Sequence, residues 1–158
     1  MKKSYLLIAS IILVLVILIL ISMVPQKTTT KWDDNQTVEV CFNLQSTCIN
    51  AEMAYSDEKK QTGLMNQTFL GPSSGMLFPY DKRGIYSFWM SETQLPLDII
   101  WISSDMKIVY IANAIPCPEN KQCEIYTPTK PAQYVLEVNS GFASQHNLQI
   151  GDEITINR

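Results

Sequence analysis

The sequence is poor in the residues from which catalytic and metal sites are usually built. It contains one histidine, His146, and it has no nucleophile elbow, no Ser-His-Asp set and no phosphate-cradling glycine loop. Its four cysteines have neither the close spacing of zinc knuckles nor that of a redox C-x-x-C motif. These absences favour a protein that is not an enzyme and that has no cofactor.

Positive charge is also scarce after the first 25 residues. From Gln26 onward there are 10 Lys and Arg against 15 Asp and Glu, which gives a net charge of −5. A cluster of Lys and Arg is the usual mark of a protein that binds nucleic acid, and no such cluster is present in the sequence. The composition therefore argues against a nucleic-acid partner.

Residues 5–24 contain no charged side chain and consist mainly of Leu, Ile and Val. As a helix, twenty residues at ~1.5 Å each span ~30 Å, the thickness of the hydrocarbon core of a bilayer. The run is longer than the ~7–15-residue core of a cleaved signal peptide, and no small-residue cleavage site follows it. We therefore predict a transmembrane signal anchor over residues 1–24, a polar stalk over 25–35 and a domain over 36–158.

The cysteines form two local pairs, Cys41 with Cys48 and Cys117 with Cys123. Alternation of apolar residues around the first pair predicts a hairpin in which Cys41 lies opposite Cys48. The second pair would close a loop rich in proline, so we predict one disulfide within each pair. Since disulfides form in oxidising compartments, the domain is expected outside the cell membrane, with the N-terminus in the cytoplasm.

Two Asn-x-Thr triplets, which begin at Asn35 and Asn66, are candidate glycosylation sites on the same side of the membrane. Triplets of this kind also arise by chance in a chain of this composition. They are therefore weak evidence for the compartment.

Short apolar runs separated by turns predict about seven strands. Ser56 is a typical N-cap residue and Gly63 can end a helix, so a short helix is expected between them. A second helix is expected within residues 139–147, capped by Asn139 or Ser140. Pro79 is expected to cut one apolar run short, with a turn over residues 81–84. The predicted fold class is α+β and mainly β, a small antiparallel, partly closed barrel-like sheet with two short helices.

Seven short motifs occur in an order that resembles the prokaryotic domain-of-unknown-function family 192, over residues 36–156. They are GLM (63–65), GMLF (75–78), FWM with a later Thr (88–90 and 93), PLDI (96–99), PC with a later Cys and Tyr (116–117, 123 and 126), YVLEV (134–138) and GD (151–152). The resemblance implies a small, secreted or membrane-tethered β-rich domain without an established activity. Members of the family commonly have Lys-Asn where this chain has Ser91-Glu92, so an anion site that depends on that lysine is not expected here.

Two acids are candidates for chemistry. Asp98, set among apolar neighbours, is either a general base or a structural acceptor of backbone N–H groups, and the second interpretation is favoured. Glu137 is expected to point outward from its strand, although it could pair with Asp98 as a second carboxylate. The lone His146 is interpreted as a surface or core residue.

Sulfur and aromatic side chains supply the remaining candidates. Met65, Met76 and Met90 could bind copper(I), although methionine more often fills gaps in a core. Trp89, Tyr86 and Tyr126 could line a groove for a sugar or peptide, although packing in the core is the favoured interpretation. The candidate binding residues for a ligand are Trp89, Met90, Asp98 and Tyr126.

The sequence therefore predicts a membrane-anchored extracytoplasmic binding or envelope-accessory module. Its expected partners are the membrane, through residues 5–24, and an envelope protein or a small ligand. The alternatives are a hydrolase that uses Asp98 with Glu137, and copper handling through the three methionines.

Overall fold

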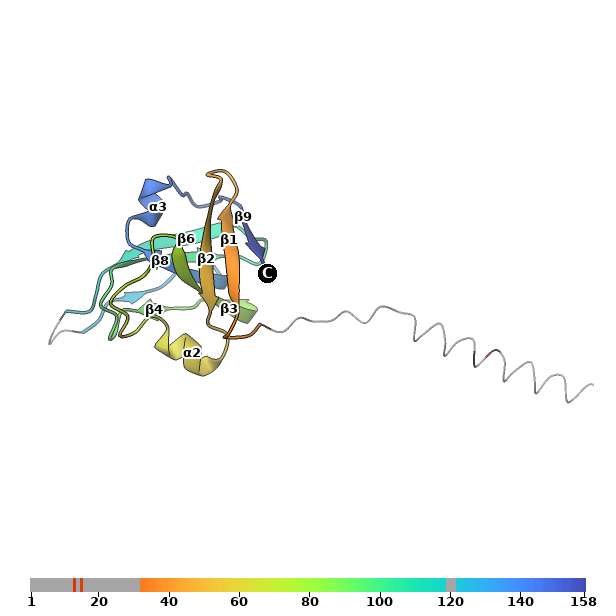
Figure 1. Cartoon of the computed structure of the whole chain (residues 1–158), viewed down its shortest axis with the longest axis horizontal. Helices are drawn as coiled ribbons and strands as arrows, with labels where there is room; N and C mark the ends of the chain where they lie inside the picture. Colours follow the sequence, from red (N-terminus) through yellow and green to blue (C-terminus); the bar gives the residue numbers. More distant parts are fainter. Residues whose placement is uncertain (1–12, 14, 16–31, 119–121) are drawn as a thin grey trace, which may run out of the picture. The chain divides into compact units, whose positions relative to one another are not determined.

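The computed structural model describes residues 13, 15, 32–118 and 122–158. The chain divides into two units, Met1–Lys31 and Trp32–Arg158, and the second unit is the β-rich domain (Figure 1). Almost all of the predicted anchor (1–24), and the stalk as far as residue 31, fall outside the described residues. Among the residues that are described, no helix has the length and apolar character needed to span a bilayer.

Seven strands form one curled sheet in the order β6-β5-β8-β3-β2-β1-β9. The two edges of this sheet approach each other, because Lys107 forms a bridge with Glu153 and the Ile154 N–H donates to the Met106 carbonyl at 3.0 Å. The result is a curled half-barrel, mainly β with two short helices, as predicted. The strands are β1 (Thr37–Phe42), β2 (Thr47–Met53), β3 (Ser74–Gly84), β5 (Leu97–Ile102), β6 (Ile108–Ala114), β8 (Ala132–Asn139) and β9 (Ile154–Asn157).

The sheet is not purely antiparallel, which corrects the prediction. β2 and β3 run parallel, with Ala51 opposite Gly75. A parallel pair needs a long crossover connection, and here residues 54–73, which include α2 (Asp57–Thr62), supply it. This crossover places α2 beside the sheet, next to the strands that carry the candidate site.

The first helix, α2, follows its local sequence signals. The Ser56 side chain accepts the Lys59 N–H at 3.1 Å, and Gly63 ends the helix with a φ of 47°. The N-cap of the second helix, α3 (Phe142–Gln145), is Gly141, which has no side chain with which to cap the helix. The predicted caps Asn139 and Ser140 were therefore wrong.

Strand β3 continues through Pro79 and through the residues 81–84 that were expected to form a turn. Its register against β8 shifts between Pro79 and Gly84, which is the irregularity expected of a bulge. Proline lacks a backbone N–H and so interrupts a ladder unless a bulge or an edge accommodates it. The predicted break at Pro79 is absent because the bulge accommodates the proline within the strand.

Both faces of the central strands are buried. On β8, Leu136 and Val138 belong to one core cluster, whereas Val135 belongs to a second cluster on the opposite face. Every residue of β5 is buried. A sheet covered on both sides leaves no outward position in its centre, so the expectation that Glu137 points to solvent was wrong.

Both predicted disulfides, Cys41–Cys48 and Cys117–Cys123, are present. In the β1–β2 hairpin Cys41 is directly opposite Cys48, and Val40 is opposite Ile49, as the alternation predicted. A separate two-stranded ribbon is formed by β4 (Phe88–Trp89) and β7 (Ile125–Tyr126).

Candidate functional site

Glu137 occupies the middle of the sheet and is only 5% exposed. On β8 it lies opposite Met76 of β3 on one side and opposite Ile99 of β5 on the other. Its Oε2 is buried and has no hydrogen-bond partner among the residues that the structure describes. Buried polar atoms are nearly always paired, so an unpaired carboxyl oxygen in this position points to a functional role.

The Glu137 side chain lines a pocket of about 30 Å³. This volume holds roughly one or two groups of the size of a water molecule. The pocket lies between α2 with the residues that follow it, the β4 strand and the second core face of the sheet. Its other lining residues are Lys60, Gln61, Thr62, Gly63, Leu64, Met65, Phe78, Phe88, Trp89 and Thr93.

Motifs far apart in the sequence meet around this pocket. The segments GLM and FWM each contribute lining residues, as do Phe78 from GMLF and Glu137 from YVLEV. The strands and the α2 crossover bring these segments together, because each motif lies on or directly after one of those elements. Four of the seven motifs on which the family resemblance depends thus contribute to one local site.

Gly63 forms the part of the pocket edge next to the acid. A Cβ atom at this position would lie 3.8 Å from the Glu137 Oε2 and 3.4 Å from the Phe78 ring. The backbone here has a φ of 47°, a conformation that glycine adopts at little cost. A side chain at residue 63 would therefore narrow the pocket directly beside the carboxyl group.

Burial raises the pKa of Glu137 to about 8. The group is therefore mostly protonated at pH 7 in the protein by itself. A carboxylic acid of this kind donates one hydrogen bond when neutral, and it becomes a strong partner for a cation when it loses its proton. Burial also raises the pKa of the nearby Tyr80, with smaller contributions from Tyr86 and Glu137.

Lys60 also lines this pocket, and its ammonium group lies over two tyrosine rings beside it. The Lys60 Nζ is 4.8 Å from the centroid of the Tyr80 ring and 5.0 Å from that of Tyr55. Within the described part of the chain, no carboxylate lies within 4.0 Å of this ammonium, since the ion pairs there join Lys59 to Glu52 and Lys107 to Glu153. The pocket is thus lined both by a buried acid, Glu137, and by a lysine without an acidic partner among the described residues.

Aromatic rings form one wall of the pocket. Phe88 packs edge-to-face against Phe78 and against Trp101, with ring centroids 5.0 Å and 5.9 Å apart, respectively. The Trp101 indole N–H donates to the Tyr86 carbonyl at 2.7 Å, which holds the wall in place. Trp89 is 54% exposed and lies opposite Ile125 on the β4–β7 ribbon, so it belongs to the outer part of the site.

Asp98 has a structural role on the other face of the sheet. Its Oδ2 accepts the Ala143 N–H of α3 at 2.8 Å, and its Oδ1 accepts the Asn113 side-chain amide at 2.8 Å. The carboxylate thus supplies the side-chain cap that Gly141 cannot provide. Asp98 was expected to accept a backbone N–H from residues 94–97 or an adjacent loop, and so to join its strand to the Trp89 strand. The observed hydrogen bonds instead join β5 to β6 and to α3.

The structure does not bring Asp98 and Glu137 together. Glu137 is directly opposite Ile99, so Asp98 is offset from it by one residue. Successive residues of a strand point to opposite faces of a sheet, and the two carboxyl groups therefore lie on opposite sides. The predicted pair of catalytic carboxylates is not formed.

The other predicted ligand-binding residues are distributed between the pocket and the core. Met65 lines the pocket, whereas Met76 and Met90 are buried in the second core cluster. The Tyr126 hydroxyl donates to Glu124 at 3.1 Å and accepts the Ile115 N–H at 3.2 Å, and Tyr126 is not part of the pocket lining. Copper binding by the methionines stays a prediction.

The remaining predicted residues lie elsewhere on the domain. Asn35 and Asn66 are exposed, and glycosylation there stays a prediction. His146 follows α3 and packs against Phe142, with ring centroids 4.5 Å apart.

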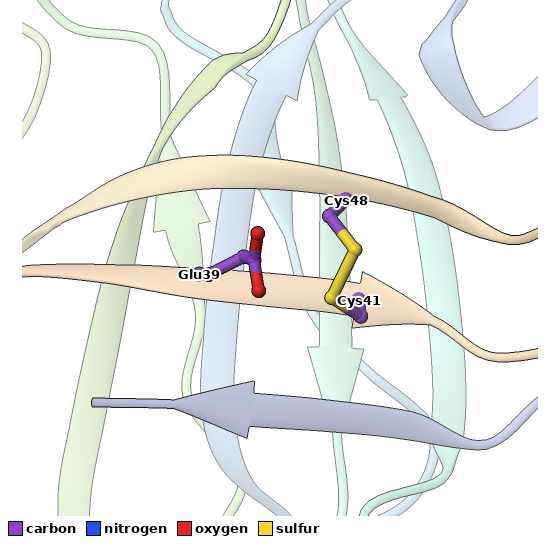
Figure 2. A group of neighbouring side chains, drawn as sticks. All are labelled: Glu39, Cys41 and Cys48. Carbon is purple, nitrogen blue, oxygen red and sulfur yellow. A yellow bond between two sulfur atoms is a disulfide. The ribbon is translucent and has the colours of Figure 1, made fainter.

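A second group of potential metal ligands, Glu39 with Cys41 and Cys48, lies on the β1–β2 hairpin, with its ligand atoms within 4.8 Å of one another. Figure 2 shows that the two sulfur atoms are bonded to each other, so no thiolate is available to a metal. The Glu39 carboxylate accepts a hydrogen bond from the Asn157 side chain at 3.1 Å. This group is therefore explained as a disulfide with a neighbouring acid.

The site was not predicted from the sequence because Glu137 was expected to point to solvent, whereas it is buried. A usable signal was present, since the residues around Glu137 form a nearly continuous apolar run, which is typical of a strand buried on both faces. The contributions of Lys60, Gly63 and Phe88 could not be inferred locally. They depend on the position that the crossover gives to α2 and on the position of the β4 ribbon.

Comparisons with known proteins agree with this architecture. The model of a family described as DUF192, uncharacterised, matches residues 38–156. A UPF0127 protein of Thermococcus kodakarensis, TK1120, is 28% identical over 97 residues, which are 61% of this chain and 58% of that protein. The chain thus aligns with less than two thirds of the length of this curated relative.

Two crystal structures are similar to the domain. One is a protein of Sinorhizobium meliloti, provisionally described as a transcription regulator, with a TM-score of 0.68 and 30% identity, over 76% of this chain and 92% of that one. The other is a protein of unknown function from Novosphingobium aromaticivorans, with a TM-score of 0.64 and 30% identity, over 75% of this chain and 83% of that one.

Proposed function

We propose that this chain, which belongs to the DUF192 family of uncharacterised proteins, is a binding module of the cell envelope whose ligand presents an amine to Glu137. The observation that carries the proposal is the buried Glu137 Oε2, which lines a pocket and has no partner among the described residues. A buried carboxyl group without a partner costs stability, and a cation that enters the pocket would offset this cost.

The shape and chemistry of the pocket favour an organic ammonium group. Its volume of about 30 Å³ suits the head of a primary amine. The aromatic residues Phe78, Phe88 and Trp89 line it, and aromatic rings attract ammonium groups through their π faces. A hard metal ion would need about six or more oxygen ligands, and this lining is mostly apolar.

The proposed location in the cell envelope is supported by two features. The apolar run over residues 5–24 has the length of a membrane anchor, and both disulfides are typical of a compartment outside the cytoplasm. The similar Sinorhizobium protein is only provisionally described as a transcription regulator, and the acidic net charge after residue 25 gives that role no support in this chain.

The experiment is calorimetric titration of the detergent-solubilised full chain with n-butylamine between pH 5 and pH 9. Amine binding requires ionised Glu137, and the fraction of ionised acid rises about tenfold per pH unit below its pKa. With a pKa of about 8, affinity should rise nearly tenfold from pH 6 to pH 7 and level off above pH 8.

The matched variants are Glu137→Gln, which keeps the shape of the side chain, and Glu153→Gln, which makes the same change at an exposed acid. We expect the first to abolish amine binding and the second to leave it unchanged. Binding that does not depend on pH, or that survives Glu137→Gln, would overturn the proposal.

A further inference from the structure

We propose that the ligand is zwitterionic, with an ammonium group that pairs with Glu137 and a carboxylate that pairs with Lys60 in the lining of the same pocket. The inference rests on the proposed function and specifies the class of ligand. It follows from the contacts of Lys60, from the position of Lys60 on α2 close to Glu137, and from the repulsion between Lys60 and a simple amine.

Lys60 is an oriented cation without an acidic partner among the described residues. Its Nζ lies over the rings of Tyr80 and Tyr55, at 4.8 and 5.0 Å from their centroids. The neighbouring Lys59, by contrast, lies 3.9 Å from the Glu52 carboxylate. Ring faces orient an ammonium group but leave its net charge uncompensated, so Lys60 presents an unneutralised charge to an anion at the pocket.

An acid close to this arrangement is already engaged. The Asp81 carboxylate accepts a hydrogen bond from the Tyr55 hydroxyl at 3.1 Å. In the described part of the chain, Asp81 forms no ion pair with Lys60, since no acid lies within 4.0 Å of that ammonium. Tyr55 therefore contacts both charged groups, and Lys60 forms no ion pair with an acid in the described part of the chain.

A single short helix fixes Lys60 relative to the acid. Lys60 lies in α2 three residues before Gly63, a separation of ~5 Å along a helix. A Cβ at Gly63 would be 3.8 Å from the Glu137 Oε2, so the end of α2 is next to the acid. Lys60 and Glu137 are thus held close to each other by the end of α2, and a short molecule would reach both.

A simple amine bound at Glu137 would be repelled by the positive charge of Lys60, which belongs to the same pocket lining. Like charges at short range repel, and an ionised carboxylate on the ligand would replace this repulsion with attraction. A molecule that carries both charges therefore complements the site better than an amine alone, and the half-exposed Trp89 would contact its methylene groups.

The test compares three ω-amino acids, glycine, 4-aminobutanoate and 6-aminohexanoate, with methylamine, n-propylamine and n-pentylamine, which lack the carboxylate. Titrations use the solubilised full chain at pH 8. We expect at least one amino acid to bind on the order of tenfold more tightly than its amine, because a second charge pair is formed. An optimum in chain length is expected, since both protein charges are fixed.

Lys60→Met should reduce the affinity for that amino acid to that for the amine, whereas Lys59→Met on the same helix should change neither. Thermal unfolding of each variant checks that the fold is kept. Equal affinities for amines and amino acids in the parent would overturn this inference and leave the proposed function standing. If no amine and no amino acid binds, both fail.

Discussion

The two faces of the central sheet each carry one buried acid, and the two acids differ in every contact. Asp98 is 3% exposed and accepts hydrogen bonds from Ala143 and Asn113. Glu137 is 5% exposed, and its Oε2 has no partner in the described part of the domain. Equal burial thus has opposite consequences, because Asp98 stabilises the fold whereas Glu137 lowers its stability and remains available to a ligand.

Of the variants that test this comparison, Glu137→Gln is expected to change the free energy of unfolding most. Burial raises the pKa of Glu137 from 4.5 to about 8, so between these values the folded protein holds a proton that the unfolded chain releases. The stability of the parent must then fall as pH rises through this window, by about 1.4 kcal/mol per pH unit. Glutamine has no such proton to lose.

We therefore expect the glutamine variant to match the parent near pH 4 and to exceed its free energy of unfolding by about 4 kcal/mol at pH 8. Urea denaturation at several pH values measures the difference. A constant difference between pH 4 and pH 8 would mean that folding does not raise the pKa of Glu137.

Asp98→Ala should have a somewhat smaller effect in the opposite direction. The variant removes two hydrogen bonds to a charged acceptor and leaves the Ala143 N–H without its partner. The expected loss of stability is about 3 kcal/mol, and Asp98→Asn, which keeps the shape and one acceptor, should lose about half as much. If both variants unfold like the parent, Asp98 does not hold α3 to the sheet.

Replacement of two glycines, one at the Glu137 pocket and one at the N-cap of α3, is expected to have the smallest effects on stability. Gly63 borders the Glu137 pocket with a φ of 47°, and Gly141 begins the helix bonded to Asp98 with a φ of 87° and open space around it. Replacement by alanine should cost about 1 kcal/mol at either position, because alanine is strained at positive φ. Only Gly63→Ala should also weaken amine binding, because its methyl group narrows the pocket. Equal binding by both variants would place the ligand elsewhere.

Local signals in the sequence predicted the parts of the fold that depend on neighbours in the chain. Alternation placed Cys41 opposite Cys48, and the capping residues Ser56 and Gly63 marked both ends of α2. The same reasoning failed at Pro79, where a bulge keeps β3 continuous. The parallel β2–β3 pair was missed because it depends on a crossover rather than on either strand.

The candidate site was harder to predict than the fold, because its properties come from distant segments. Nothing near Glu137 in the sequence shows that α2 and β4 cover its face of the sheet. Asp98 was predicted to accept a backbone N–H, but the donor in α3 lies 45 residues away in the chain. Burial of a charged side chain is a tertiary property, and here it decides which acid is structural and which is available.

The most direct test of the account is NMR titration of the Glu137 side-chain carboxyl carbon, with and without n-butylamine. We predict a pKa of about 8 for this group in the protein alone, since burial disfavours its charged form. Saturating amine should lower that pKa by at least about one unit, because an ammonium partner stabilises the ionised carboxylate. A pKa near 4.5 in the protein alone, or a raised pKa that the amine leaves unchanged, would contradict the assignment of Glu137 as the ligand-binding acid.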